Sequence, residues 1–228
     1  MTGVLRAAWQ IARKDLVIEA RSRELASMTL FFAVACILVF AFAFVDDMGR
    51  PLPGAAAGIL WVAIAFSGTL ALGRTFERER QSETLRALLL APVERPAVYL
   101  GKLSALLVLM LAVELVVVAL VGLLFDAPLG AAPWMLSGLL LSGTIGFAAV
   151  GVLFAAMLVR TRTRDVLLPV LLYPVTVPVV IAGVKGTQAI FAPDPNLDLA
   201  AMWLAMLISF DAAFITLSLW TFGPVMSE

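Results

Sequence analysis

The sequence predicts an all-α integral membrane protein, built as a bundle of six transmembrane helices with one long charged segment in the middle. Hydrophobic residues make up 62% of the 228 residues and charged residues only 14%. A soluble domain of this size carries about 25% charged residues. The mean hydropathy is +1.04. Long apolar stretches recur along the chain, and none shows the short alternating pattern of a barrel strand.

Six apolar stretches are long enough to cross a membrane, since about 20 residues span the hydrocarbon core as a helix. Each is between 19 and 27 residues long. Together they make one transmembrane domain of residues 1–228 and leave almost no chain for a soluble domain. The predicted spans are Leu25–Val45, Ala55–Gly73, Leu103–Phe125, Pro133–Val159, Val166–Val184 and Leu199–Gly223.

Basic residues are concentrated on one side of this predicted bundle. Of the 16 lysines and arginines, 14 lie before Leu25, in Arg74–Lys102 or in Arg160–Asp165. The opposite side holds only Arg50 and Lys185. Because positive residues favour the cytoplasmic side of a membrane, we expect a multi-pass protein with both termini in the cytoplasm.

Residues 1–24 predict a helix that lies flat on the membrane surface. Apolar residues recur at spacings of three and four, while Arg13 and Arg21 lie largely off that stripe. The segment is too charged for a signal peptide, and its alternative interpretation is a cytoplasmic lead-in that frays. The stripe consists of Leu5, Trp9, Ala12, Leu16 and Ala20.

Two of the spans contain residues that shape helices. Pro169, Pro174 and Pro178 lie within ten residues of one span, and each removes a helical hydrogen bond. We therefore expect a kinked or broken helix inside the bundle, where neighbours satisfy the freed carbonyls. Ser142 and Gly146 form a small-xxx-small pair that favours close helix packing.

Three residues inside the predicted spans allow two interpretations each. Glu114 and Asp211 are intramembrane acids, which mark either a proton or substrate path or a protonated carboxyl group bonded to a neighbouring helix. Trp61 is either an interfacial anchor, which we favour, or a packed aromatic residue.

The polar segment between the second and third spans runs from Arg74 to Lys102. It is far longer than a turn between two helices needs, and it carries Leu85, Leu88 and Leu89 on one helical face before Pro92 and Pro96 break the chain. A solvated charged loop is the ordinary interpretation of such a run. The clustered leucines favour instead a helix that docks on a soluble partner.

The residue inventory excludes most enzyme classes. A phosphate-binding Walker loop has its first glycine five residues before a Gly-Lys pair, and a serine or threonine directly after that pair. In this chain Pro96 occupies the position of the first glycine, and Leu103 follows Gly101-Lys102. The chain has no histidine, and Cys36 is its only cysteine. We therefore predict that this chain has no catalytic residue and no metal site, and that it binds neither a cofactor nor nucleic acid. Any ATP would be used by another chain.

Five motifs in combination resemble the CcmB family, the haem exporter protein B of cytochrome c maturation. The resemblance covers nearly the whole chain. The motifs are Arg13-x-Asp15-Leu16-x-x-Glu19-x-Arg21-x-x-Glu24, Leu72-x-Arg74-x-Phe76-x-x-Glu79, Thr84-Leu85-x-x-Leu88-Leu89-Leu90-Ala91-Pro92-Val93, Tyr99-Leu100-Gly101-Lys102 and Leu168-Pro169-Val170-Leu171-x-Tyr173-Pro174.

The resemblance implies a permease subunit of an ABC-type complex, with the six-helix fold of ABC-2 exporters, in the bacterial inner membrane. Its implied partners are an ATPase subunit (CcmA), the haem-handling CcmC, the small CcmD, the haem chaperone CcmE and a second copy of this chain, all within membrane lipid. ATP would be hydrolysed in the partner and haem handled by partner subunits. The absence of histidine fits a subunit that does not itself ligate haem.

The resemblance also assigns residues to roles. The 74–102 segment would hold a coupling helix in a groove of the ATPase, and the N-terminal helix would be an interfacial elbow. Ser82, Glu83 and Arg86 depart from the family pattern, so only the apolar contacts of the coupling helix carry over. The coupling residues would be Arg74, Phe76, Glu79, Leu85, Leu88, Leu89 and Pro92, and the elbow residues Trp9, Arg13, Asp15, Leu16, Glu19 and Arg21.

Other functions remain open at this point. One is an ABC-2 permease that exports a lipid, glycan or drug. Another is a proton-linked secondary carrier that uses Glu114 and Asp211, and a third is a purely structural scaffold.

Overall fold

The computed structural model describes residues 2–45, 52–77, 94–159 and 161–227, and every regular element in these ranges is a helix. Six of the described helices are long and apolar enough to span a membrane. The predicted all-α, six-span fold class is therefore confirmed. The elements are α1 (Thr2–Ser22), α2 (Glu24–Ala43), the short 3-10 helix η1 (Pro53–Ala55), α3 (Ala56–Arg74), α6 (Arg95–Phe125), α7 (Pro133–Met157), α8 (Arg164–Phe191) and α9 (Leu197–Ser227).

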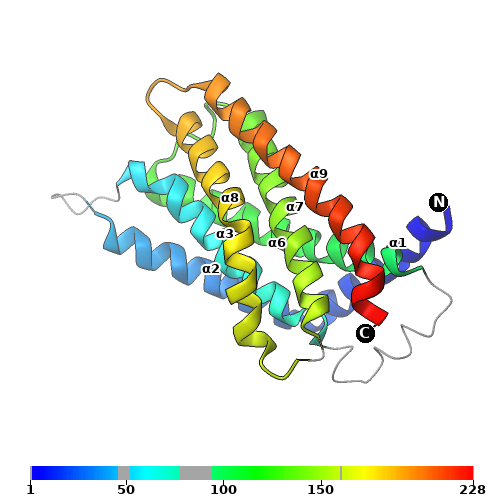
Figure 1. Ribbon diagram of the computed structural model, residues 1–228. Helices are drawn as coiled ribbons and strands as arrows, with labels where there is room; N and C mark the ends of the chain where they lie inside the picture. Colours follow the sequence, from blue (N-terminus) through cyan, green and yellow to red (C-terminus); the bar gives the residue numbers. More distant parts are fainter. Residues whose placement is uncertain (1, 46–51, 78–93, 160, 228) are drawn as a thin grey trace.

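Helix α7 is the centre of the bundle (Figure 1) and packs against α3, α6, α8 and α9. In its most apolar window 78% of the residues are buried, against 17% for α9. Small residues make this position possible, because side chains of the neighbouring helices reach the α7 backbone where it carries only glycine.

One end of the bundle, called here the loop end, joins helices that flank residues 78–93. The Lys102 ammonium near the start of α6 donates to the Thr75 carbonyl just after α3. Arg95, the first residue of α6, donates to the Gly223 carbonyl near the end of α9. Helix α1 packs on α6 at this end as well.

Helix α6 begins earlier than the sequence predicts. The helix starts at Arg95 rather than Leu103, and Pro96 lies in its first turn. Proline is tolerated there because the first amide groups of a helix have no carbonyl partner within it. The prediction that Pro96 breaks the chain is therefore wrong, and Lys102 lies inside the helix.

Helix α8 runs without interruption from Arg164 to Phe191, through all three of its prolines. The prediction of a broken helix is wrong, while a kink at Pro169, Pro174 and Pro178 stays a prediction. Pro174 is exposed on the outside of the bundle rather than inside it.

Trp61 is a core residue and not an interfacial anchor. Its indole ring lies where Gly143 of α7 and Gly183 of α8 leave no side chain in the way. The indole Nε1 donates to the Thr187 hydroxyl at 2.9 Å, so the buried N–H has its partner. The interfacial interpretation of Trp61 is therefore wrong.

Candidate functional site

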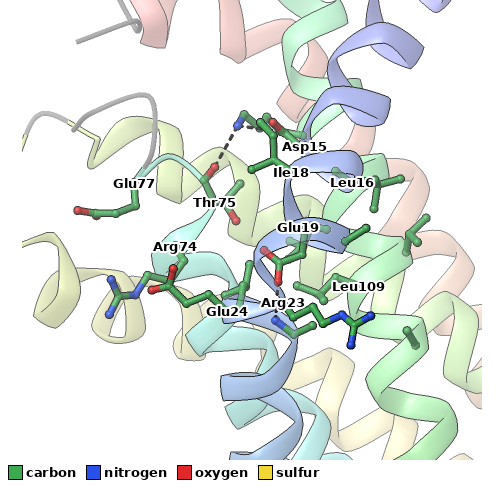
Figure 2. Close-up of a pocket in the computed structure, with 18 of the residues that line it drawn as sticks. Asp15, Leu16, Ile18, Glu19, Arg23, Glu24, Arg74, Thr75, Glu77 and Leu109 are labelled. Carbon is green, nitrogen blue, oxygen red and sulfur yellow. Dashed lines mark hydrogen bonds and ion pairs between the residues drawn. The ribbon is translucent and has the colours of Figure 1, made fainter. Parts of the chain in front are cut away.

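A buried lysine anchors the start of the charged segment. Lys102 is only 3% exposed, and its ammonium lies 2.9 Å from an Asp15 carboxylate oxygen and 3.1 Å from the Thr75 carbonyl oxygen. The same ammonium lies 5.2 Å from the centroid of the Phe76 ring, within the range of a cation–π contact. Lys102 therefore joins α1 and the end of α3 to α6. Figure 2 labels its two partners, Asp15 on α1 and Thr75 at the end of α3.

The residue before this lysine explains how α1 comes so close. A Cβ atom on Gly101 would lie 2.8 Å from the Ala8 carbonyl oxygen and 2.8 Å from the Ile11 Cβ atom. Only glycine permits this approach of α1 to α6 without a shift in the neighbouring atoms. Gly101 thus brings the helices together, and Lys102 joins them.

A second buried cation, Arg164 at the start of α8, reaches the end of α3. Its guanidinium lies 2.5 Å from the Glu77 carboxylate and also donates to the Gly73 carbonyl. Removing one partner of such a buried pair is costly, since the other charge stays buried without compensation. Lys102 and Arg164 therefore fix residues 73–77 to two different helices.

The other flank of the segment is fixed as well. Arg95 donates to the Gly223 carbonyl at 2.5 Å. One turn later the Tyr99 hydroxyl donates to the Ala149 carbonyl at 3.1 Å, and the Tyr99 ring packs 5.4 Å from that of Phe222. We name these anchoring residues the loop-root cluster, which consists of Asp15, Gly73, Thr75, Phe76, Glu77, Arg95, Lys102 and Arg164.

The predicted coupling residues divide into two groups. Arg74 is exposed, but Phe76 is buried beneath the Lys102 ammonium, so Phe76 packs inside this chain instead of presenting a docking surface. The docking face itself stays a prediction. Its residues Glu79, Leu85, Leu88, Leu89 and Pro92 lie outside the described part of the chain.

The predicted apolar stripe of α1 splits between two environments. Ala12 is 1% exposed, whereas Leu5 and Trp9 are 63% and 65% exposed. Helix α1 thus packs its small residues against the bundle and leaves large apolar ones outside. That distribution suits a helix at a membrane surface, whose interfacial role stays a prediction. Of the other elbow residues, Arg13 and Arg21 are exposed and Leu16 is partly buried.

Glu19 has a local task at the junction of α1 and α2. Only Arg23 separates the two helices, and its backbone is left-handed, with φ of 53°. The Glu19 carboxylate accepts a hydrogen bond from the Ala26 amide at 2.8 Å, which caps the start of α2 from the preceding helix. Glu19 therefore fixes the bend between the helices.

The two intramembrane acids each meet a hydroxyl group of α7. Thr144 donates to Glu114 Oε2 at 2.8 Å, and Ser142 donates to Asp211 Oδ2 at 2.6 Å. The remaining carboxyl oxygens, Oε1 and Oδ1, have no hydrogen-bond partner among the described residues. Gly146 leaves the space that Asp211 fills. Bonding to a neighbouring helix is thus present, and a proton path stays a hypothesis.

Sequence reasoning missed the most densely bonded part of this site. In the sequence Lys102 marks only the end of the polar segment and of one motif, and Arg164 is one of the basic residues of the stretch Arg160–Asp165. The available signal was position, because Lys102 follows a glycine and Arg164 precedes a long apolar run. Their partners Thr75 and Gly73 accept hydrogen bonds through backbone carbonyl groups. Every residue has such a group, so the sequence does not identify these two as partners.

Comparison of the sequence with known proteins identifies the family of this chain. Residues 6–226 match the family model described as CcmB protein. The chain is 36% identical over 160 residues to heme exporter protein B of Paracoccus denitrificans, covering 69% of this chain and 71% of the relative. It is 28% identical over 208 residues to heme exporter protein B of Rhodobacter capsulatus, covering 90% of this chain and 91% of that protein.

A third similar protein is heme exporter protein B of Pseudomonas aeruginosa, which is 28% identical over 197 residues. The alignment covers 86% of this chain and 86% of the relative. The family match includes every described residue of the loop-root cluster and both intramembrane acids. This multi-pass membrane chain therefore belongs to the CcmB protein family.

Proposed function

We propose that this chain is the permease subunit of an ABC-type complex in cytochrome c maturation, and that it converts ATP hydrolysis in a separate subunit into movement of membrane helices. The observation that carries this proposal is the loop-root cluster. Buried Lys102 and Arg164 join the start of the cytoplasmic segment to the bundle at two independent points.

A segment that receives force from a soluble partner needs a stiff attachment, since a freely swivelling loop would move without moving the membrane helices. The ion pairs of Lys102 and Arg164 supply that attachment on one flank, and Arg95 supplies it on the other. Displacement of residues 78–93 would reach α1, α3, α6, α8 and α9 through these contacts.

The cargo and partners follow from the family. The similar proteins are named heme exporter protein B, so the proposed task is haem delivery or release of the haem-loaded chaperone. The proposed partners are a CcmA-like ATPase, CcmC-like and CcmD-like membrane proteins, a CcmE-like chaperone and a second copy of this chain. The proposed setting is the bacterial inner membrane with both termini cytoplasmic, ATP in the partner and no cofactor bound by this chain.

The docking step is tested by replacing Leu85 and Leu89 with aspartate in the full chain, coexpressed with its ATPase. Loss of ATPase from the affinity-purified membrane complex is expected, with normal membrane insertion. Arg162→Asp is the matched control, because Arg162 is exposed in the other basic turn and should leave ATPase recovery unchanged. Full recovery of the ATPase by the double variant would refute coupling through this leucine face.

The cargo is tested separately by complementation. A strain lacking its own CcmB-like gene should regain covalently bound haem in c-type cytochromes when this chain is expressed with its partners. Normal assembly without any copy would favour the other candidate of the same class, an ABC-2 permease for a lipid, glycan or drug.

A proton-linked carrier is a second candidate, favoured by one observation. Glu114 and Asp211 are buried, and each has one carboxyl oxygen without a hydrogen-bond partner among the described residues. A carrier of this kind would work without ATP. Loss of maturation after inactivation of the partner's ATP site would therefore exclude it.

A further inference from the structure

Helices α7 and α9 lie side by side in the bundle (Figure 1). Gly138 of α7 lies against Leu204 of α9, and Gly146, two turns later, lies against Phe210 and Asp211. Contacts that advance together along both helices mean that α7 and α9 run in the same direction, towards the loop end. Two parallel helices can shift along each other without separating, provided that the side chains between them leave room.

The residues of α7 that face Asp211 are small. Ser142 donates to Asp211 Oδ2 at 2.6 Å, and a glycine stands one turn before this serine and another one turn after it, at Gly138 and Gly146. The second oxygen, Oδ1, lies against Gly146, where an added Cβ atom would be only 2.5 Å away. Asp211 thus occupies the space between Ser142 and Gly146.

The space between Gly138 and Ser142 has the same composition, a glycine on one side and the same serine hydroxyl on the other. The side chain now closest to Gly138 is that of Leu204, which belongs to α9 and would move with it. In the other direction Val150, which is fully buried, stands one turn after Gly146. Asp211 therefore has one equivalent position on α7, one turn further from the loop end.

The carboxyl group of Asp211 is held by a contact that can be remade. Asp211 is 9% exposed, and its Oδ1 has no hydrogen-bond partner among the described residues. A single bond to a neutral hydroxyl is weaker than a charged pair. Because Ser142 lies between the two spaces, its hydroxyl can bond the carboxyl group in either of them.

The contact on the other side of α7 offers no second position. Thr144 donates to Glu114 of α6 at 2.8 Å, but Leu140 stands one turn before Thr144 and Phe147 three residues after it. These large side chains close the neighbouring spaces, and Lys102 fixes α6 at the loop end. Helices α6 and α7 therefore keep their register, whereas α9 is free to change its own.

The loop end provides a handle on α9. Arg95, which follows residues 78–93 closely in the chain, donates to the Gly223 carbonyl near the end of α9. In the most apolar window of α9 only 17% of the residues are buried, the lowest share among the six described spans. Little packing therefore opposes movement along the axis of α9. A push on Arg95 towards the membrane would move α9 away from the loop end, the direction in which α7 leaves room.

We propose that α9 is the helix that the charged segment moves, and that it slides along α7 by one helical turn, about 5.4 Å. Asp211 would pass from the space beside Gly146 to the space beside Gly138. One-turn displacements of this kind occur where two packed helices have two discrete arrangements. This inference rests on the proposed coupling function and names the movement that coupling would drive.

Gly138→Ala separates the two positions. In the present arrangement the added Cβ atom would lie 3.2 Å from Leu204 Cδ2, the far end of a flexible side chain that can turn aside. In the shifted arrangement it would meet the Asp211 carboxyl group as a Cβ atom on Gly146 would now, at 2.5 Å. The shifted arrangement alone should therefore be blocked.

The variant is expressed as the full chain with its partners. Its unfolding midpoint should stay within about 2 °C of the wild type, and its recovery of the ATPase should be normal. Most of the covalently bound haem in c-type cytochromes should nevertheless be lost. Gly58→Ala is the matched control, because nothing lies within 4 Å of its added Cβ atom, and it should keep maturation.

A second measurement records the movement itself. Spin labels are attached through Ser137→Cys and Trp220→Cys in a Cys36→Ser background, in complexes diluted with unlabelled chain. Both sites are exposed, and they lie towards opposite ends of α7 and α9. Trapping ATP in the partner should shorten the distance between the labels by up to about 5 Å, one helical turn. Gly138→Ala should abolish the shortening, and Gly58→Ala should keep it.

Two results would overturn the sliding of α9. One is full maturation by a stably folded Gly138→Ala variant. The other is an unchanged label distance in the wild type when ATP is trapped, which decides the matter even if Gly138→Ala proves unstable. Either result leaves the coupling proposal standing, provided that the ATPase is recovered with the wild type and lost with the Leu85 and Leu89 variant. Failure of that recovery pattern would remove the coupling proposal itself.

Discussion

Two regions of the molecule bury polar groups with different chemistry. One is the loop-root cluster, and the other, called here the α7 seam, consists of Ser142 and Thr144 of α7 with their partners Asp211 and Glu114. At the loop root, Lys102 and Arg164 are charged groups that bind carboxylates and backbone carbonyls of other helices. In the seam, Glu114 and Asp211 each meet one neutral hydroxyl of α7. Charged pairs resist separation more strongly than single neutral contacts. The loop root is therefore built as a rigid attachment, whereas the seam joins helices by bonds that can exchange.

The largest expected effect comes from Lys102→Met. This change removes the buried cation, so the Thr75 carbonyl loses its donor and Asp15 keeps only its ion pair with the exposed Lys14, and the free energy of unfolding should fall by about 3 kcal/mol or more. Denaturant or thermal unfolding of the purified protein in detergent measures the change. Lys185→Met is the control, since Lys185 is exposed on α8 away from the loop end, and it should have an effect within about 0.5 kcal/mol.

A double-mutant cycle with Asp15→Asn sharpens this prediction. If the ion pair is responsible, the Lys102 substitution should cost less in the Asp15→Asn background than in the wild type. Additive effects of the two substitutions would contradict a direct pairing and would reduce the loop root to ordinary packing.

Arg164→Lys should have the second largest effect. Lysine keeps the charge but lacks the planar fork that contacts Glu77 and the Gly73 carbonyl together, and about 1 to 3 kcal/mol should be lost. Arg162→Lys, two residues earlier and exposed, is the matched control. The same stability for both variants would mean that Arg164 acts only as a positive charge.

Gly146→Ala tests the seam by packing rather than by charge. The added Cβ atom would lie 2.5 Å from Asp211 Oδ1 and 3.1 Å from Phe210 Cδ1, so these side chains of α9, or α9 itself, would have to shift. A loss of about 1 to 3 kcal/mol is expected for such overpacking. Gly58→Ala is the control, because nothing lies within 4 Å of its added Cβ atom, and a comparable loss there would contradict this explanation.

Glu114→Gln should have the smallest effect. The amide oxygen can still accept from the Thr144 hydroxyl, so stability should change by less than about 1 kcal/mol, and cytochrome c maturation should be retained. Haem staining of c-type cytochromes measures maturation. Loss of maturation with unchanged stability would show that the carboxyl group itself is needed, and would favour the proton-linked candidate.

The sequence was a good guide wherever a signal is local. Long apolar runs identify the six spans, because every backbone group in lipid must find its partner within the helix. Helix ends were predicted less well. Pro96 lies in the first turn of α6 instead of breaking the chain, and α8 continues to Phe191 through three prolines. In both cases the residue is proline, which is tolerated in the first turn of a helix but removes a hydrogen bond in its interior. Which of these applies depends on where the helix begins, and only the structure gives that.

The site residues divide in the same way. Glu114 and Asp211 could be identified from the sequence, because a charge inside an apolar run is conspicuous wherever it points. Trp61 was assigned to the membrane interface, yet it fills space left by Gly143 and Gly183 on two other helices. That packing depends on three segments that are far apart in the chain, so no local sequence pattern predicts it.

The sequence by itself determined that this is a six-span membrane protein of the CcmB family with a charged segment after its second span. These properties depend on composition, period and motif, which are properties of the chain alone. Only the tertiary structure decided that Lys102 and Arg164 anchor that segment, because their ion pairs with Asp15 and Glu77 join residues 87 apart in the chain in each case. Burial and pairing of a charge depend on which helices meet, and helices meet only in the folded bundle.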